Sequence, residues 1–114
     1  MDFTQDQVNA IVREARDAAW EASDKFFREK LGGVDQYACG FAWVNIYKVK
    51  GNTKLGRMLK AAGVRKNDYD KAFQLWNPAG YPAQNIDTLE HGALAAARVF
   101  AKYGFDAYAG SRLD

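Results

Sequence analysis

A continuous helical pattern runs from residue 5 to residue 30, and every fold open to this 114-residue chain must accommodate it. Thr4 and Gln7 have the spacing of a capping box, which starts a helix. The apolar residues that follow recur in steps of four and three and so share one stripe: Val8, Val12, Ala15, Ala19, Ala22 and Phe26. Gly32 and Gly33 are suited to end it. At about 1.5 Å per residue the helix is about 39 Å long, so we expect it either to bend or to pack on a second copy.

A strand pattern covers residues 41–49, where aromatic and β-branched side chains are dense. Both faces of this strand are apolar as far as Tyr47: Phe41, Trp43, Tyr47 and Val49 on one face, and Ala42, Val44 and Ile46 on the other. We therefore expect a central strand of a sheet, whose Lys48 and Lys50 end emerges into water.

The remaining pattern alternates helices and strands. It predicts a short helix over 53–62, a strand over 72–76, a helix from Asp87 to about 103 and a strand over 105–113. Asp87 and Glu90 repeat the capping-box spacing, while 65–70 is expected to be a polar loop. The predicted fold class is α+β, with a small three-stranded sheet packed with three helices in the order α-β-α-β-α-β. We expect a single compact domain over 1–114, with strand direction left open.

Composition and the first residues of the chain point to a soluble protein. The single cysteine, Cys39, excludes an internal disulfide and suits a reducing compartment. The first residues lack the basic-then-apolar pattern of a secretion signal, and no apolar run approaches membrane-spanning length. The expected localisation is therefore cytoplasmic, without a membrane partner.

The charges are distributed unevenly along the chain. Residues 48–71 carry eight basic and two acidic side chains, whereas residues 1–47 carry five basic and eight acidic ones. The whole chain has a formal net charge of only +2. A near-neutral protein with its positive charge in one segment can attract an anionic partner there.

The basic segment predicts a nucleic-acid or other polyanion surface. Its candidate contact residues are Lys48, Lys50, Lys54, Arg57, Lys60, Arg65 and Lys66. If the strand end, the short helix and the following loop are adjacent in space, these side chains form one positive patch able to contact several phosphates. The alternative interpretation is that they are ordinary solvated charges, since no known nucleic-acid-binding motif is present.

The connection after the second strand is a candidate ligand loop. Trp76, Asn77, Tyr81 and Gln84 place aromatic rings and amides on a segment stiffened by two prolines. An aromatic face beside amides can stack on a base or ring and hydrogen-bond its edge. The alternative is that the aromatics cap the core and the amides bind loop backbone groups.

No residue pattern indicates catalysis, a metal or a cofactor. The single histidine, His91, and the single cysteine lie far apart in sequence and do not make a zinc pattern, and the carboxylates lack calcium-loop spacing. Glycine-rich phosphate loops are absent as well. We expect a protein that is not an enzyme.

Several short stretches resemble small uncharacterised proteins of tailed bacteriophages. They are Phe41-Ala42-Trp43-Val44, Leu75-Trp76-Asn77-Pro78, Gln84, Asp87 and the terminal Gly110-Ser111-Arg112-Leu113-Asp114. The resemblance covers about two-thirds of the chain and brings no assigned activity with it. It implies a phage accessory protein acting in the host cytoplasm.

The leading functional expectation is a non-enzymatic, phage-type accessory protein whose segment 48–71 engages an anionic partner, most simply nucleic acid. The alternative is a protein-interaction module, either a host-protein inhibitor or a homo-oligomeric structural component, acting through the N-terminal helix. Trp20 and Phe27 would give that helix a second apolar edge. A third interpretation is a small-molecule-binding or catalytic pocket near Trp76, Asn77, Gln84 and His91.

Overall fold

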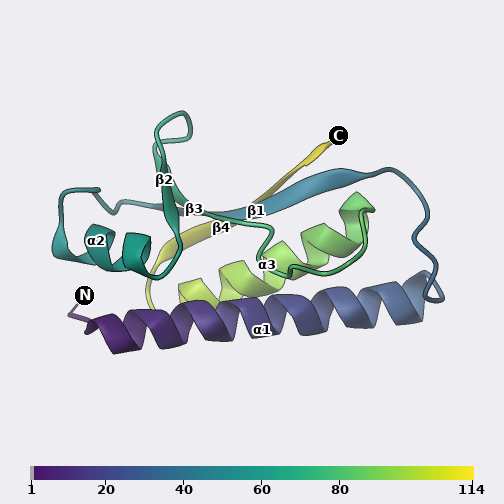
Figure 1. Ribbon diagram of the computed structural model, residues 1–114, viewed down its shortest axis with the longest axis horizontal. Coiled ribbons are helices and arrows are strands. Elements are labelled where there is room, and N and C mark those ends of the chain that lie inside the picture. The colour runs from purple at the N-terminus through teal and green to yellow at the C-terminus, as the bar shows by residue number, and fades with distance from the viewer. Residues whose placement is uncertain (1) are drawn as a thin grey trace.

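A computed structural model describes residues 2–114 as three helices and one antiparallel sheet of four strands (Figure 1). The elements in chain order are α1 (Gln5–Lys30), β1 (Gly40–Tyr47), α2 (Lys54–Ala61), β2 (Arg65–Asn67), β3 (Ala72–Trp76), α3 (Ile86–Lys102) and β4 (Asp106–Leu113). The α+β class is confirmed, and α1 has the range expected for the long helix. Its N-terminus carries the expected capping box between Thr4 and Gln7.

The strands are arranged in the order β2-β3-β1-β4, and every neighbouring pair is antiparallel. β1 is an interior strand, in which Val44 pairs with Leu75 of β3 and with Ala109 of β4. Its central position is what the two apolar faces predicted. Strands that share an antiparallel neighbour run parallel to each other, so β1 is parallel to β2 across β3, and β3 is parallel to β4 across β1. The connections through α2 and α3 are therefore crossovers between parallel strands that are not adjacent.

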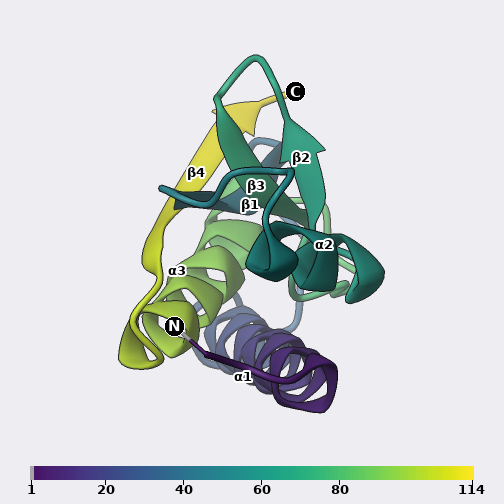
Figure 2. The same cartoon turned by 90° about the vertical axis from the view of Figure 1, so that its left-hand side faces the viewer.

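All three helices lie on one side of the sheet (Figure 2). α3 packs against β1 and β4, and α1 packs chiefly against α3, so the layers run from sheet to α3 to α1. The two long helices approach closely at Gly92, where a Cβ would lie 2.5 Å from Ser23 Oγ and 3.0 Å from the Ala19 carbonyl oxygen. A residue without a side chain is required there for this spacing.

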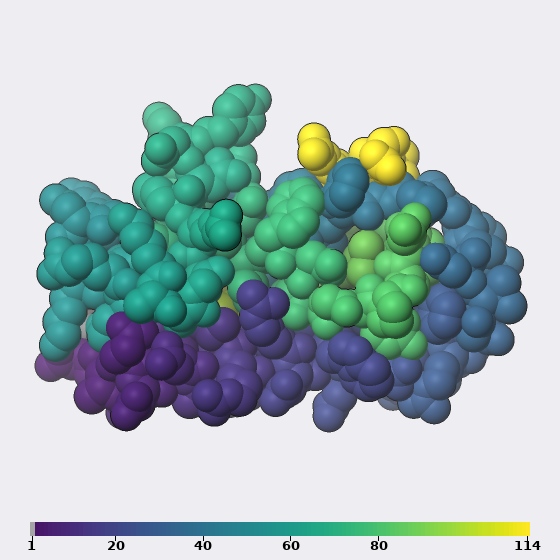
Figure 3. All heavy atoms as spheres, viewed as in Figure 1, coloured from purple at the N-terminus to yellow at the C-terminus, as the bar shows by residue number. Residues whose placement is uncertain are grey.

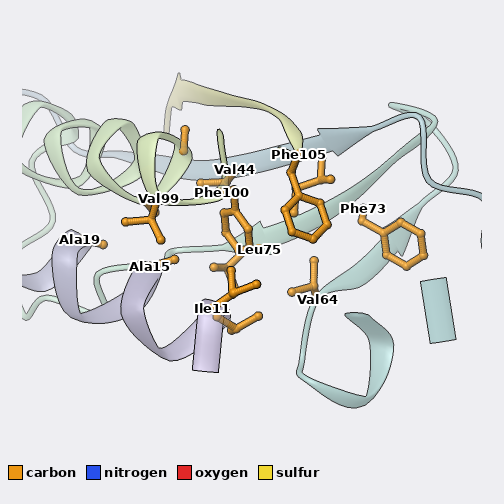
Figure 4. Packing of buried hydrophobic residues seen from close by; sticks show 14 of the residues in the cluster. Ile11, Ala15, Ala19, Val44, Val64, Phe73, Leu75, Val99, Phe100 and Phe105 are labelled. Carbon is orange, nitrogen blue, oxygen red and sulfur yellow. The ribbon is translucent and has the colours of Figure 1, made fainter. Parts of the chain in front are cut away.

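The core fills the space between the sheet and the helices (Figure 4). Val44 and Leu75 face it from the sheet, Ile11 from α1 and Phe100 from α3. Phe100 is completely buried and meets the Phe105 ring edge-on, with centroids 5.8 Å apart. Because all three helices lie on the same side, no helix of residues 2–114 covers the opposite side of the sheet.

Two expectations about the elements are wrong. The sheet has a fourth strand, β2, where a polar loop was expected, so the order is α-β-α-β-β-α-β. β2 is three polar residues long and pairs only with β3 at the sheet edge, so it shows no apolar alternation. The third helix begins at Ile86 and is capped by Asn85, whose Oδ1 accepts the Thr88 N–H at 2.8 Å. Asp87 therefore lies in the first turn and is not the cap.

Candidate functional site

The face of the sheet that points away from the helices is rich in aromatic side chains. Cross-strand partners share a face, so the pairing of β1 with β3 and β4 places the following residues there: Phe41, Trp43, Asn45, Tyr47, Gln74, Trp76, Asp106, Tyr108, Gly110 and Arg112. Trp76 and Tyr108 are 46% and 59% exposed, and Trp43 is half-buried. We call this surface the open face.

The aromatic rings of the open face form one group. Trp43 and Trp76 have ring centroids 5.5 Å apart and planes within 3° of parallel, and Phe41 lies 5.5 Å from Trp76. The Arg112 guanidinium sits over the Phe41 ring at 5.4 Å, a cation–π geometry. Rings from β1 and β3 thus form a single aromatic surface, and the Arg112 side chain of β4 lies against it.

Gly110 on β4 gives Trp43 its position. Trp43 pairs with Gly110 across the sheet, and a Cβ at Gly110 would lie 2.6 Å from the indole Cε2. The indole therefore occupies the space that any other side chain would fill. Because Gly110 has no side chain, the Trp43 ring can lie close against the sheet, where the ring can offer an aromatic face to a ligand.

A polar cluster adjoins the aromatic group. Asp70, in the β2–β3 turn, accepts hydrogen bonds at Oδ2 from Asn45 Nδ2 at 3.2 Å and from Gln74 Nε2 at 3.3 Å. Gln74 also donates to Asn45 Oδ1 at 3.1 Å, and Asn45 donates to the Tyr47 hydroxyl at 3.2 Å. These bonds hold the hairpin turn against the open face.

A hollow of about 380 Å³ lies between this turn and the tryptophans. It is lined by Trp43, Asn67, Tyr69, Asp70, Gln74, Trp76 and Arg112. The hairpin stands up at one part of the upper surface and the C-terminal residues stand up at another (Figure 3). Tyr69, at the hairpin tip, is 96% exposed. The hollow combines ring faces with amide, carboxylate and guanidinium groups, which suits a flat ligand with polar edges.

The structure divides the basic segment into two parts. Lys54, Arg57 and Lys60 are exposed on α2, at the same end of the molecule as the turn that carries Lys48 and Lys50 (Figure 1). Lys48 is not part of a regular strand, because its φ is 64° and β1 ends at Tyr47. The strand expected over residues 41–49 therefore ends two residues early, and Lys48 and Lys50 lie in the segment that follows it.

The other two basic candidates lie on opposite faces of β2. Arg65 is exposed and pairs with Gln74, which puts it on the open face. Lys66 pairs with Phe73 on the helical side, and its Nζ lies 5.3 Å from the Phe73 ring centroid. Lys66 thus covers a core aromatic. Among the seven candidates, Arg65 is the one placed on the open face beside the aromatic group.

The residues of the candidate ligand loop come together at a second hollow. Trp76, Asn77, Tyr81 and Gln84 all line a cavity of about 430 Å³, together with Phe41 of β1. Asn77 has a left-handed backbone with φ 44°, and its N–H donates to the Ala42 carbonyl at 2.9 Å. Trp76 does not cap the core, since it lies on the open face. The cavity therefore extends the aromatic surface beyond the end of β3.

Tyr81 links this loop to the long helix. Its hydroxyl donates to Asp24 Oδ1 at 2.7 Å, and its ring lies 5.4 Å from Trp20 and 5.5 Å from Phe27. The bond lowers the pKa of the Asp24 carboxyl and raises the pKa of Tyr81. Trp20 and Phe27, expected to form a second apolar edge, share Tyr81 as a partner, while Trp20 stays 45% exposed.

Asp35 anchors the far end of the same loop. Its carboxylate accepts from Asn85 Nδ2 at 2.9 Å, from the Gln84 N–H at 2.9 Å and from the Asn85 N–H at 3.1 Å. These bonds, the Asn85 side chain first, hold the pKa of Asp35 below its ordinary value of 3.8. The loop that lines the cavity is thus tied to the segment after α1.

This anchor predicts a pH-dependent contribution to stability. The pKa of the Asp35 carboxyl is lower in the folded chain than its ordinary value of 3.8. The stabilisation from its hydrogen bonds is therefore present above pH 3.8 and is lost as the pH falls through the pKa of the folded state. We expect Asp35→Asn to lower the free energy of unfolding at about pH 7, with a gap to wild type that narrows toward about pH 2. Urea unfolding at both pH values measures it. Asp17→Asn, at an exposed aspartate of α1, is the control, and an equal loss there would contradict the assignment.

The side chains of residues 2–114 offer no ready metal site. No group of three or more His, Cys, Asp or Glu side chains in that range is placed to hold a metal ion. No helix of the same range combines the length and the apolar character needed to cross a bilayer. Cys39 is exposed at the entry to β1.

Sequence reasoning missed several residues of the open face. Phe41 and Trp43 form one apolar side of a strand in the sequence, but a strand with two apolar sides predicts burial of both. Arg112 and Gly110 gave no local signal, because their roles depend on pairing with β1. Trp76 was found because it begins the proline-stiffened loop.

Protein-family models, curated protein sequences and solved structures give no match to this chain. The resemblance to tailed-bacteriophage proteins therefore stays a prediction. Any function assigned to the protein rests on the geometry of its own surfaces.

Proposed function

We propose that the protein is a non-enzymatic binding protein that holds single-stranded nucleic acid on the open face of its sheet. The observation that carries the proposal is the aromatic group of Phe41, Trp43 and Trp76, which none of the helices in the described part of the chain covers. Single-strand-binding proteins commonly stack unpaired bases on aromatic rings of an antiparallel sheet, because every base has a π-face.

The surroundings of the rings fit a base better than a purely apolar ligand. Amides of Asn45 and Gln74 and the carboxylate of Asp70 line the polar part of the open face, where they can bond the edges of a stacked base. Arg112 and Arg65 lie on the same face and can contact phosphates or stack on bases. A duplex hides its base faces, so the proposal includes a preference for single strands.

The basic end of the molecule supplies the long-range attraction in this proposal. Lys54, Arg57 and Lys60 are exposed, and α2 contacts β2, the strand that brings Arg65 to the open face. A nucleic-acid strand lying on the rings can leave the sheet toward this end. Binding its phosphates would then release counterions, which makes binding weaken as salt rises.

Reversal of these charges tests the electrostatic part. We expect the triple variant Lys54→Glu, Arg57→Glu, Lys60→Glu to bind a labelled single-stranded oligonucleotide more weakly, with a salt slope that is shallower by about 0.7 for each phosphate the protein no longer touches. Fluorescence anisotropy between about 50 and about 200 mM salt measures both quantities. The matched control reverses Arg13, Arg16 and Lys25, three exposed residues of α1. Equal losses in both variants, or binding that ignores salt, would contradict a defined basic surface.

The alternative proposal places a protein partner on α1. Trp20 favours it, because this ring is 45% exposed beside Tyr81 and Phe27 and a partner could cover it. The two proposals separate by substitution: Trp20→Ala would weaken a protein contact and leave oligonucleotide binding unchanged.

A further inference from the structure

β4 is an edge strand with one side unoccupied. It is eight residues long and pairs along its whole length with β1, and within residues 2–114 no element pairs with its other side. A long edge strand presents backbone N–H and C=O groups to any strand that can align with them. It is also free of proline, which would interrupt such pairing.

The direction of these backbone groups follows from the ladder with β1. The Asp114 N–H donates to the Cys39 carbonyl at 3.1 Å, so this residue directs its backbone toward β1. Strand geometry alternates, and the register is continuous from Asp106 to Leu113. Even-numbered residues of β4 therefore bond β1, and odd-numbered residues direct their N–H and C=O groups outward.

We propose that β4 of a second copy of this chain pairs antiparallel with β4 around a two-fold axis at Ala109. This pairing joins the two four-stranded sheets into a single sheet of eight strands. Backbone hydrogen bonds between the two copies can form only between residues whose N–H and C=O groups point outward. Ala109 of one copy therefore pairs with Ala109 of the other, and Ala107 pairs with Ser111. A shift by one residue would set outward groups against inward ones. A shift by two that centres the pairing on Gly110 would place Asp106 against Asp114, which is a like-charge contact.

The side chains agree with the register centred on Ala109. Asp106 of each copy lies opposite Arg112 of the other, and both residues are on the open face. These are non-hydrogen-bonded pairs, where side chains approach most closely. Among the described residues, Arg112 forms no salt bridge. Asp106 forms one salt bridge, with Lys48 at 3.8 Å. Two opposite-charge pairs thus form across the axis.

The same register places Tyr108 of each copy opposite Gly110 of the other. Tyr108 is 59% exposed, and the space over Gly110 is filled by the Trp43 indole, so the Tyr108 ring would lie beside that indole. Trp43 already lies over Gly110 from the β1 side, so the aromatic groups of the two copies would meet at the axis. On the helical side of β4 the residues near the axis are Ala107, Ala109 and Ser111, which are small enough to let a strand approach.

A charge swap tests the pairing. Sedimentation equilibrium of the full chain is expected to give twice the mass of one chain, with a measurable dissociation constant. Asp106→Arg and Arg112→Asp, each alone, place like charges at both symmetry-related pairs and are expected to raise that constant by at least about tenfold. The double variant Asp106→Arg, Arg112→Asp restores opposite charges and is expected to recover the dimer. A monomeric wild type, or a double variant no better than the single ones, would overturn the proposal.

A proline separates pairing from folding. The Ala109 N–H points outward, so Ala109→Pro removes a donor from the free edge and none from the ladder with β1. We expect this variant to be monomeric with an unchanged far-ultraviolet circular dichroism spectrum. A folded Ala109→Pro variant that still dimerises would exclude β4 as the interface and point to α1. Oligonucleotide binding by the same variant reports on the open face independently.

Discussion

When Trp43 and Trp76 are both replaced by alanine, we expect the protein to lose most of its affinity for single-stranded nucleic acid. Stacking of a base on an aromatic side chain contributes about 1–3 kcal/mol, so the loss of two stacks amounts to about 2–6 kcal/mol, or at least about 30-fold in affinity. Both rings lie on the open face, so their removal leaves the core packing between sheet and helices in place. Fluorescence anisotropy with a labelled oligonucleotide, at one fixed salt concentration, measures the change.

Trp20 provides a matched control for this experiment. It is 45% exposed, against 46% for Trp76, but it lies on α1 beside Tyr81. Trp20→Ala removes a similarly exposed ring of the same residue type from a different place. Unchanged affinity in Trp20→Ala assigns the effect to the open face. A comparable loss in both would show that the tryptophans act through overall stability or non-specific adhesion.

Phe100→Ala is expected to cause the largest loss of stability. Phe100 is fully buried between α3 and the sheet and packs edge-on against Phe105, so truncation removes apolar contacts and leaves a cavity. Such a change costs about 3–5 kcal/mol, a large part of the roughly 5–15 kcal/mol that stabilises a domain of this size. Urea unfolding followed by circular dichroism measures the shift in midpoint.

The control for that measurement is Tyr69→Ala at the tip of the β2–β3 hairpin. Tyr69 is 96% exposed, so its removal should change the free energy of unfolding by no more than about 0.5 kcal/mol. A large effect at Tyr69, or a small one at Phe100, would mean that the hydrophobic core does not lie between the sheet and the helices.

Local patterns predicted the long elements because those elements follow local rules. The capping box at Thr4 and the apolar stripe define α1, and the dense apolar run defines β1. β2 escaped prediction because its residues are polar and the strand that pairs with it is β3. The start of α3 was misplaced because Asn85 and Asp87 are both capping residues in sequence. The contact of Asn85 with Asp35 is visible only in three dimensions.

The candidate site was only partly predictable for the same reason. Trp76, Asn77, Tyr81 and Gln84 are close in sequence, so their common placement at one cavity followed from a single loop. The open face instead combines residues from several strands, and its register depends on hydrogen bonds between distant segments. A strand with two apolar faces does not reveal which face the helices leave uncovered.

Local sequence was enough to specify the α+β class, the long capped helix, the interior position of β1 and the concentration of basic side chains in 48–71. These follow from periodicity, capping chemistry and charge, which act over a few neighbouring residues. Three further features emerged from the folded arrangement: the helices cover one side of the sheet, Trp43 lies over Gly110, and β4 has a free edge. They depend on how distant segments pack, and packing is a property of the whole chain.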